Sequence, residues 1–137
     1  MNDLDLILRG GRVLTSGADA IADIGVRNGQ ISVVGEITST APREISCIGK
    51  VVTPGGVDAH CHIEQMSGMG LMNADTFETA TRSAAIGGTT CVVSFAAQQK
   101  GQRLAEAMAD YAARAERGAA IDHAFHIIVA DIDAPIV

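Results

Sequence analysis

VVTPGGVDAHCH, residues 51–62, is the most informative stretch of this sequence. A Pro-Gly-Gly turn leads into a short apolar run that ends in two imidazoles, His60 and His62. In an extended strand, residues i and i+2 point to the same face, so one strand can direct both rings at a single divalent metal ion. Cys61 between them then faces the opposite way. Neutral imidazole is the commonest protein ligand for zinc and similar ions, and this context favours a metal-binding pair over two histidines with structural contacts alone.

The length and composition indicate one folded domain of ordinary size. The chain has 137 residues, of which 47% are hydrophobic and only 3% aromatic. Such a composition suits closely packed α/β structure rather than disorder. The formal net charge is −6 and the 10 basic residues are scattered along the chain, which leaves no electrostatic footprint for a phosphate backbone. We therefore expect no nucleic acid partner.

The cysteines and the N-terminal residues favour the cytoplasm. Cys47, Cys61 and Cys91 are an odd number without regular spacing, which argues against a disulfide framework. The sequence begins Met-Asn-Asp-Leu-Asp, acidic where a secretory signal would be basic, and no apolar run approaches bilayer length. We expect a cytoplasmic protein without a membrane partner.

Residues 4 to about 52 predict a small antiparallel β unit. Alternating residues on both sides of Asn28-Gly29 predict a hairpin, because both central positions of a type I′ turn need positive φ. Gly10-Gly11 predicts another turn between two short strands, and a further segment alternates like a half-buried strand. The strands expected here span residues 4–8, 12–14, 22–26, 30–34 and 43–48.

After residue 54 the pattern changes to alternating strands and helices. Asp75 is predicted as the N-cap of the first helix with Glu78 as its capping-box partner, and Gly118 as the C-cap of the second helix. This order implies parallel strands with helical crossovers, and it places the two histidines toward the carboxyl end of the first strand, where active sites of such sheets are built. The expected elements are strand 57–63, helix 76–86, strand 89–96, helix 102–117 and strand 125–130.

The motif PGGVDAHCHIEQ at residues 54–65, with GGTT at residues 87–90 opening the next strand, resembles the dihydropyrimidinase/hydantoinase family of the amidohydrolase superfamily. The resemblance runs the length of the chain but covers about the first third of such an enzyme, since a (β/α)8 barrel alone needs roughly 250 residues. It implies an α/β fold with a small antiparallel β domain. Residues 1–53 would be an N-terminal β-sandwich part, and residues 54–137 the first βα units of an incomplete metal-dependent hydrolase (β/α)8 (TIM) barrel.

The resemblance also implies a binuclear metal centre, usually zinc, that activates a hydroxide to open a cyclic amide. The family holds its two ions with an H-x-H pair, a carbamylated lysine, two later histidines and a late aspartate that shuttles the proton. His60 and His62 match the first pair, whereas Lys50 and Lys100 do not match the bridging lysine. We therefore assign no catalytic residue within this chain and expect it to be inactive alone. The resemblance implies a homo-oligomer for the full-length form.

Glu64, two residues after the histidine pair, bears on the substrate. Dihydroorotases resemble H-x-H-x-R, in which the arginine can pair with a substrate carboxylate, whereas an acidic group repels one. The resemblance therefore implies small neutral rings such as dihydropyrimidines and hydantoins. Glu64 and Ser67 are candidate pocket residues, although a flexible connection is the commoner explanation for such a loop.

Three further polar residues near the predicted strands have structural explanations as well as functional ones. Asp58 would share a strand face with His60, and it either accepts a hydrogen bond from an imidazole and so orients the ring, or is a turn residue at the start of the strand. His123 and His126 are three residues apart, so they should face opposite sides of a strand, and we expect structural roles for both.

Two other functions stay open at this point. One is a catalytically dead relative with a role in interaction, as in the collapsin-response-mediator proteins, which lack the metal-binding pair. His60 and His62 argue against that function. The other is a truncated product without activity of its own, which the missing lysine, histidines and aspartate favour for the isolated chain.

Overall fold

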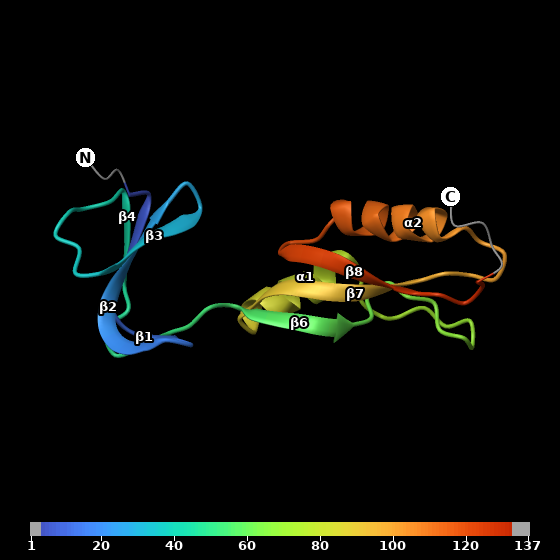
Figure 1. The fold of residues 1–137 in the computed structure, drawn as a ribbon, viewed down its shortest axis with the longest axis horizontal. Helices are drawn as coiled ribbons and strands as arrows, with labels where there is room; N and C mark the ends of the chain where they lie inside the picture. Colours follow the sequence, from blue (N-terminus) through green and yellow to red (C-terminus); the bar gives the residue numbers. More distant parts are fainter. Residues whose placement is uncertain (1–3, 133–137) are drawn as a thin grey trace. The chain divides into compact units, whose positions relative to one another are not determined.

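The computed structural model describes residues 4–132, and the chain divides into two compact units, Met1–Pro54 and Gly55–Val137 (Figure 1). The first unit consists of strands and loops, and the second alternates strands with helices. No helix within residues 4–132 is long and apolar enough to cross a membrane.

The first unit is a mixed sheet in the order β3-β2-β1-β4, with β5 also paired to β1. β1, β2 and β3 pair antiparallel, and the β2–β3 pair is the predicted hairpin, but β4 and β5 run parallel to β1. The prediction of an antiparallel unit is wrong for these two, because the chain crosses from the β3 edge to the opposite side of β1 before β4 begins. The strands are β1 (Leu6–Thr15), β2 (Ala18–Arg27), β3 (Gln30–Gly35), β4 (Arg43–Ser46) and β5 (Val51–Val52).

Asn28 and Gly29 form the predicted turn between β2 and β3, with φ angles of 50° and 73°. The other predicted turn, at Gly10-Gly11, is wrong, because β1 continues through both glycines and pairs with β2 on either side of them. A register shift at this point shows that the glycines form a bulge, with Gly10 at φ 66°. A Cβ on Gly11 would lie 2.6 Å from Val52 Cγ2, so the close approach of β5 requires glycine there.

Arg9, next to the bulge, pairs with carboxylates from two neighbouring strands. Its guanidinium donates to Glu44 Oε2 at 2.9 Å and to Asp23 Oδ2 at 3.1 Å. The other Asp23 oxygen accepts a hydrogen bond from the Gly10 backbone N at 2.8 Å. This backbone hydrogen bond, together with Arg9, holds the pKa of Asp23 below its ordinary value.

We expect Asp23→Asn to reduce the stability of the first unit at neutral pH and to weaken its sensitivity to acid. A carboxylate whose pKa is lowered by folding stabilises the fold above the pKa of the unfolded chain, and this contribution is lost as the pH falls through the folded-state pKa. Denaturant unfolding from neutral to acidic pH measures the effect. Asp19→Asn, which removes an exposed pair with Arg12, should change stability less. Equal losses of stability in acid for Asp23→Asn and the unsubstituted chain would contradict this role.

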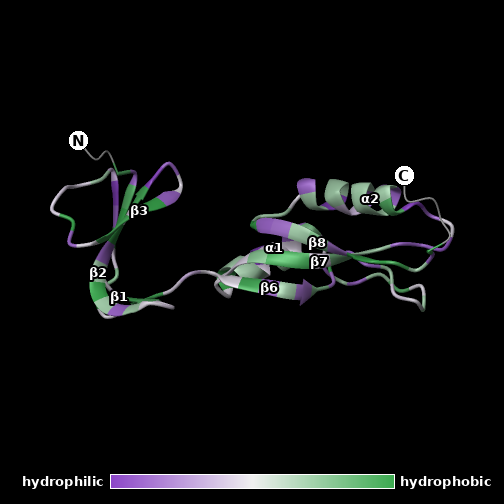
Figure 2. Cartoon of the chain, viewed as in Figure 1, coloured by the Kyte–Doolittle hydropathy of each residue, from purple (hydrophilic) through white to green (hydrophobic). Residues whose placement is uncertain are grey.

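The second unit is a parallel sheet with two helices. The strand order is β6-β7-β8 with both pairings parallel, which confirms the predicted alternation of strands and helices. Figure 2 shows the middle strand, β7, as hydrophobic over most of its length, as expected for a strand with a neighbour on each edge. The elements are β6 (Gly56–Cys61), α1 (Phe77–Ile86), β7 (Thr89–Ala97), α2 (Leu104–Glu116) and β8 (Asp122–Ile128).

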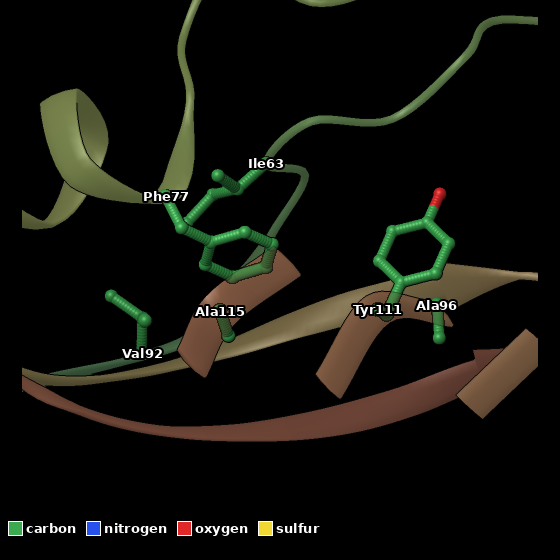
Figure 3. Close-up of a cluster of buried hydrophobic side chains, with 6 residues drawn as sticks. All are labelled: Ile63, Phe77, Val92, Ala96, Tyr111 and Ala115. Atoms are coloured by element: carbon green, nitrogen blue, oxygen red, sulfur yellow. The ribbon is translucent and has the colours of Figure 1, made fainter. Parts of the chain in front are cut away.

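Both helices pack on the same face of this sheet. Phe125 of β8 contributes to the packing, with its ring centroid 6.0 Å from that of Phe77 and 6.4 Å from that of Tyr111. Side chains alternate along a strand, so Phe95 lies on the other face, which neither helix covers. The buried cluster between helices and sheet contains Ile63, Phe77, Val92, Ala96, Tyr111 and Ala115 (Figure 3).

The start of α1 differs from the prediction by one residue. Thr76, not Asp75, is the N-cap, and its capping-box partner is Thr79 rather than Glu78. Thr79 N donates to Thr76 Oγ1 at 3.2 Å, and Thr76 N donates to Thr79 Oγ1 at 3.0 Å. The threonine pair thus makes the reciprocal bonds that glutamate was expected to complete, while Asp75 Oδ1 accepts from the Thr79 hydroxyl at 2.8 Å.

The other element ends also shift. Helix α2 begins at Leu104 and has Arg117 rather than Gly118 as its C-cap. Strand β8 begins at Asp122, before the predicted start, because Asp122 already pairs with Cys91 of β7. These differences change the lengths of the elements and leave their order as predicted.

Gly55→Ala should destabilise the second unit by about 1–3 kcal/mol. A Cβ at residue 55 would lie 2.1 Å from Thr90 Oγ1 and 2.7 Å from Thr90 Cβ. Rotation of the Thr90 side chain does not move its Cβ, so the clash is relieved only if the backbone shifts. Gly68→Ala is the matched control, because a Cβ there meets nothing within 4 Å. Denaturant unfolding measures both variants. An unchanged midpoint for Gly55→Ala would show that the turn tolerates a side chain.

Candidate functional site

His60 and His62 lie side by side where β6 ends. The strand stops at Cys61 rather than at the predicted residue 63, so His60 is within β6 and His62 directly follows it. Their ring centroids are 5.5 Å apart and the ring planes are inclined by 63°. Both rings contact the phenyl ring of Phe95 in β7, at centroid distances of 4.6 Å for His60 and 5.0 Å for His62. The i, i+2 spacing therefore brings both imidazoles to the face of the sheet opposite the helices.

Cys61 points the other way, toward the core cluster under the helices. Burial, followed by the nearby charge of Asp58, raises the pKa of its thiol. Cys61 is therefore a neutral thiol at physiological pH and adds no thiolate to the histidine face.

A bulge in β6 changes the expected position of Asp58. The register pairs Asp58 with Val92 and Cys61 with Ser94, so the alternation that would place Asp58 on the same face as His60 is broken. Asp58 Oδ1 accepts a hydrogen bond from the backbone N of His60 at 3.0 Å. The carboxylate therefore holds the backbone of the bulge.

The chain that leaves β6 forms a loop held by Asn73. Its Oδ1 accepts a hydrogen bond from the Gln65 backbone N at 2.8 Å, and its Nδ2 donates to the His62 carbonyl oxygen at 3.3 Å. The Asn73 backbone N donates to the Gln65 carbonyl oxygen at 3.0 Å. Gln65 in turn places its Oε1 2.5 Å from Nδ1 of His62. Neither amide side chain stands out in the sequence, because no local pattern links residue 65 to residue 73.

A cavity of about 360 Å³ opens beside His62. Ser67 lines it, and its hydroxyl oxygen also accepts a hydrogen bond from the Leu71 backbone N at 3.1 Å, which shapes the loop. A β-bridge between Met66 and Met72 closes the loop at its base. The lining residues are His62, Gln65, Ser67, Met69, Leu71, Met72 and Asn73.

Glu64 is not among the residues that line this cavity. Its Oε2 accepts a hydrogen bond from the Phe77 backbone N at 2.9 Å, at the N-terminus of α1. Its carbonyl oxygen accepts from Arg114 Nη1 at 2.6 Å, and its backbone has a φ of 46°. The carboxylate thus satisfies a free N–H of the helix and complements the positive end of the helix dipole. The position of Glu64 two residues after His62 does not predict its contact with Phe77, which is 13 residues away in sequence.

The remaining histidines face opposite sides of β8, as their spacing predicts. The ring of His123 lies 5.8 Å from that of Phe125, on the helix side. His126 lies on the other face, with its ring 4.9 Å from Phe95 and its Nε2 3.0 Å from the Ala59 carbonyl oxygen.

Within residues 4–132, no group of three or more histidine, cysteine, aspartate or glutamate side chains is placed to hold a metal ion.

Comparison with curated proteins identifies related enzymes, although no protein-family model matches the chain. It is 42% identical over 128 residues to a D-hydantoinase of Ralstonia pickettii, an alignment that covers 93% of this chain and 28% of the relative. It is 35% identical over 130 residues to a dihydropyrimidinase of Rattus norvegicus, covering 90% of this chain and 25% of the relative. The chain thus spans little more than a quarter of the length of these relatives.

Solved structures give the same assignment. A D-hydantoinase structure matches with a TM-score of 0.89 at 42% identity, over 93% of this chain and 28% of that one. An N-acyl-D-glutamate deacylase from Bordetella bronchiseptica, solved with zinc and a phosphonate inhibitor, matches with a TM-score of 0.52 at 31% identity, over 68% of this chain and 19% of that one. Over the residues that it contains, this chain belongs to the D-hydantoinase and dihydropyrimidinase family and corresponds to an N-terminal portion of its members.

Proposed function

We propose that the second unit supplies the first two metal ligands of an active site that hydrolyses neutral cyclic amides, such as dihydropyrimidines and hydantoins. The observation that carries this proposal is the pair of imidazoles packed on Phe95 at the carboxyl end of a parallel strand. That end of parallel strands is where such folds build their active sites.

The architecture supports a matching division of the chain. We assign residues 54–137 to the first βα units of a (β/α)8 barrel whose interior is the histidine face, since both helices cover the other face. We assign residues 1–53 to part of the β-sandwich domain of the same enzyme. We propose that the other strands and metal ligands of such a barrel correspond to parts of the relatives that the alignment with this chain does not cover.

The residues present suit a divalent metal ion, with zinc as our proposal. Imidazole nitrogen is a preferred zinc ligand, and the two rings lie on one face within reach of a common ion. Zinc is also the metal in the deacylase structure that shares part of this fold. Two ligands fall short of the three protein ligands typical of catalytic zinc, so the chain provides only part of the site.

The chain's own residues hold and orient the pair. When bound, the metal supplies a Lewis acid that polarises the amide carbonyl and activates water at neutral pH. Phe95 supports the planes of both rings. Ser94 Oγ accepts a hydrogen bond from the Ile63 backbone N at 3.2 Å, which fixes the backbone directly after His62.

The cavity beside His62 suits a small neutral ring. No lysine or arginine lines it, so it offers no cation for a substrate carboxylate. Glu64 adds no negative charge to it, because its carboxylate is bound to the start of α1. Three apolar and three neutral polar side chains share the lining with His62: Met69, Leu71, Met72, Gln65, Ser67 and Asn73.

The 137-residue chain should bind zinc or cobalt weakly through His60 and His62. His60→Ala and His62→Ala should each abolish measurable binding, because each removes half of the ligands. His123→Ala, on the helix face of the sheet, is the matched control and should bind like the unsubstituted chain. Cobalt titration followed by absorbance measures all three. Unchanged affinity in both His60→Ala and His62→Ala would contradict the proposed metal site.

Hydrolysis should appear only when the rest of the site is supplied. The chain alone with zinc should not open dihydrouracil or hydantoin, whereas a chimera in which it replaces the matching portion of the Ralstonia pickettii D-hydantoinase should hydrolyse hydantoin. In the chimera, His60→Ala or His62→Ala should lower turnover by about 100-fold or more, since losing even an indirect contact to a ligand costs that much at the upper end. His123→Ala should retain turnover.

Two results would redirect the proposal. A folded chimera that binds metal without hydrolysing hydantoin would favour an inactive relative with a role in interaction. Turnover by the bare chain that both histidine substitutions abolish would mean that the missing ligands come from its own residues or from a symmetric partner.

The isolated chain should also self-associate or bind hydrophobic dyes. Within residues 4–132, β6 and β8 each have one edge without a partner strand. Val57 of β6 is 63% exposed and Ile86 at the end of α1 is 90% exposed, so the unit carries exposed apolar side chains as well as open strand edges. Sedimentation and dye fluorescence across a concentration series test this. A monodisperse monomer with a sharp cooperative melt and no dye binding would contradict it.

A further inference from the structure

We propose that Gln65 is a positioning residue that holds His62 in the tautomer with the proton on Nδ1, which leaves Nε2 as the nitrogen that donates to a metal ion. The proposal rests on the assignment of His62 as a metal ligand. It adds a residue outside the H-x-H motif, and it states which nitrogen of His62 is used.

The contact between the two side chains is the observation behind the proposed tautomer. A neutral imidazole carries a hydrogen on one ring nitrogen and a lone pair on the other. The carbonyl oxygen of an amide can only accept, so Oε1 at 2.5 Å from Nδ1 requires that Nδ1 of His62 carries the hydrogen. The lone pair is then on Nε2. Metal-bound histidines generally donate their other ring N–H to an acceptor of this kind.

Phe95 and Gln65 restrain the ring in different directions. The His62 ring is stacked nearly parallel to Phe95, with 13° between the planes, which fixes the plane of the imidazole. Stacking alone permits two orientations, because a half turn about the Cβ–Cγ bond flips the ring and returns it to the same plane. The hydrogen bond from Nδ1 to Gln65 selects one of those two orientations and so aims Nε2.

Gln65 is itself held by the loop, so its side chain is well placed to act on the ring. Its backbone N and carbonyl oxygen both bond to Asn73, at 2.8 Å to the side-chain oxygen and 3.0 Å to the backbone N. Asn73 also donates from Nδ2 to the His62 carbonyl oxygen at 3.3 Å. The loop that lines the cavity is therefore connected to both the backbone and the ring of the ligand.

The tautomer gives a readout that a merely structural role for Gln65 would not change. If the amide were turned around, its NH2 group would donate to an unprotonated Nδ1, and the hydrogen would lie on Nε2. Nitrogen-15 chemical shifts of the ring, measured in the metal-free 137-residue chain at a pH that keeps imidazole neutral, separate the two forms. The His62 signals are assigned by their loss in His62→Ala.

We expect the Nδ1–H form of His62 in the unsubstituted chain. Gln65→Leu should shift the signals toward the Nε2–H form and weaken cobalt binding by about 10-fold or more. Gln65→Glu, which keeps an acceptor, should restore both the tautomer and the affinity. Gln30→Leu and Gln30→Glu make the same two side-chain changes in β3 of the first unit and are the matched controls. Neither control should alter the tautomer.

An Nε2–H form in the unsubstituted chain would overturn the inference, even if Gln65→Leu failed to fold. Unchanged tautomer and affinity in a folded Gln65→Leu variant would overturn it as well. The same titration separates this failure from that of the proposed metal site. If His62→Ala loses cobalt binding and Gln65→Leu does not, only the role of Gln65 fails; if His62→Ala binds normally, the metal site itself fails.

Discussion

The packing of two imidazoles on one phenyl ring is the contact on which the site depends. Phe95 can serve both rings because β7 is the middle strand, with β6 directly beside it in parallel register. Its neighbours Ser94 and Ala96 are fully buried on the helix side, so the helices take one face of the strand and the histidines the other. This separation leaves His60 and His62 exposed on the face that the helices do not cover.

The exit from β6 ties the same site to the helical layer. Glu64 has a positive φ, its carboxylate accepts a hydrogen bond from Phe77 N at the start of α1, and its carbonyl oxygen accepts one from Arg114 of α2. One residue further on, Gln65 turns toward His62. Adjacent residues therefore contact opposite faces of the sheet: Glu64 bonds to the helices and Gln65 bonds to His62. These contacts hold the segment directly after the histidine pair.

Patterns with strict local geometry could be predicted from the sequence. The Asn28-Gly29 turn needs two positive φ angles, and the i, i+2 spacing of His60 and His62 needs only an extended strand, so both are found in the structure. The alternation of strands and helices after residue 54 follows from hydrophobic periodicity, which packing preserves. These features depend on a few neighbouring residues.

Features set by packing between distant segments could not be predicted. Gly10-Gly11 has the composition of a turn, but β5 packs against it and the glycines form a bulge inside one strand. The bulge at Asp58 depends on the register with β7, and the contact of Glu64 depends on where α1 begins. Gln65 acts on His62 because Asn73, eight positions along, closes the loop. None of these partners is adjacent in sequence.

X-ray absorption at the zinc edge of the zinc-loaded chain shows whether His60 and His62 hold the metal ion. We expect two imidazole nitrogens at about 2.0–2.1 Å from zinc, with the remaining positions filled by oxygen, and the loss of imidazole scattering in His60→Ala and His62→Ala. Sulfur scattering at about 2.3 Å, which would mean that a cysteine holds the metal, or a spectrum that the two substitutions leave unchanged, would contradict it.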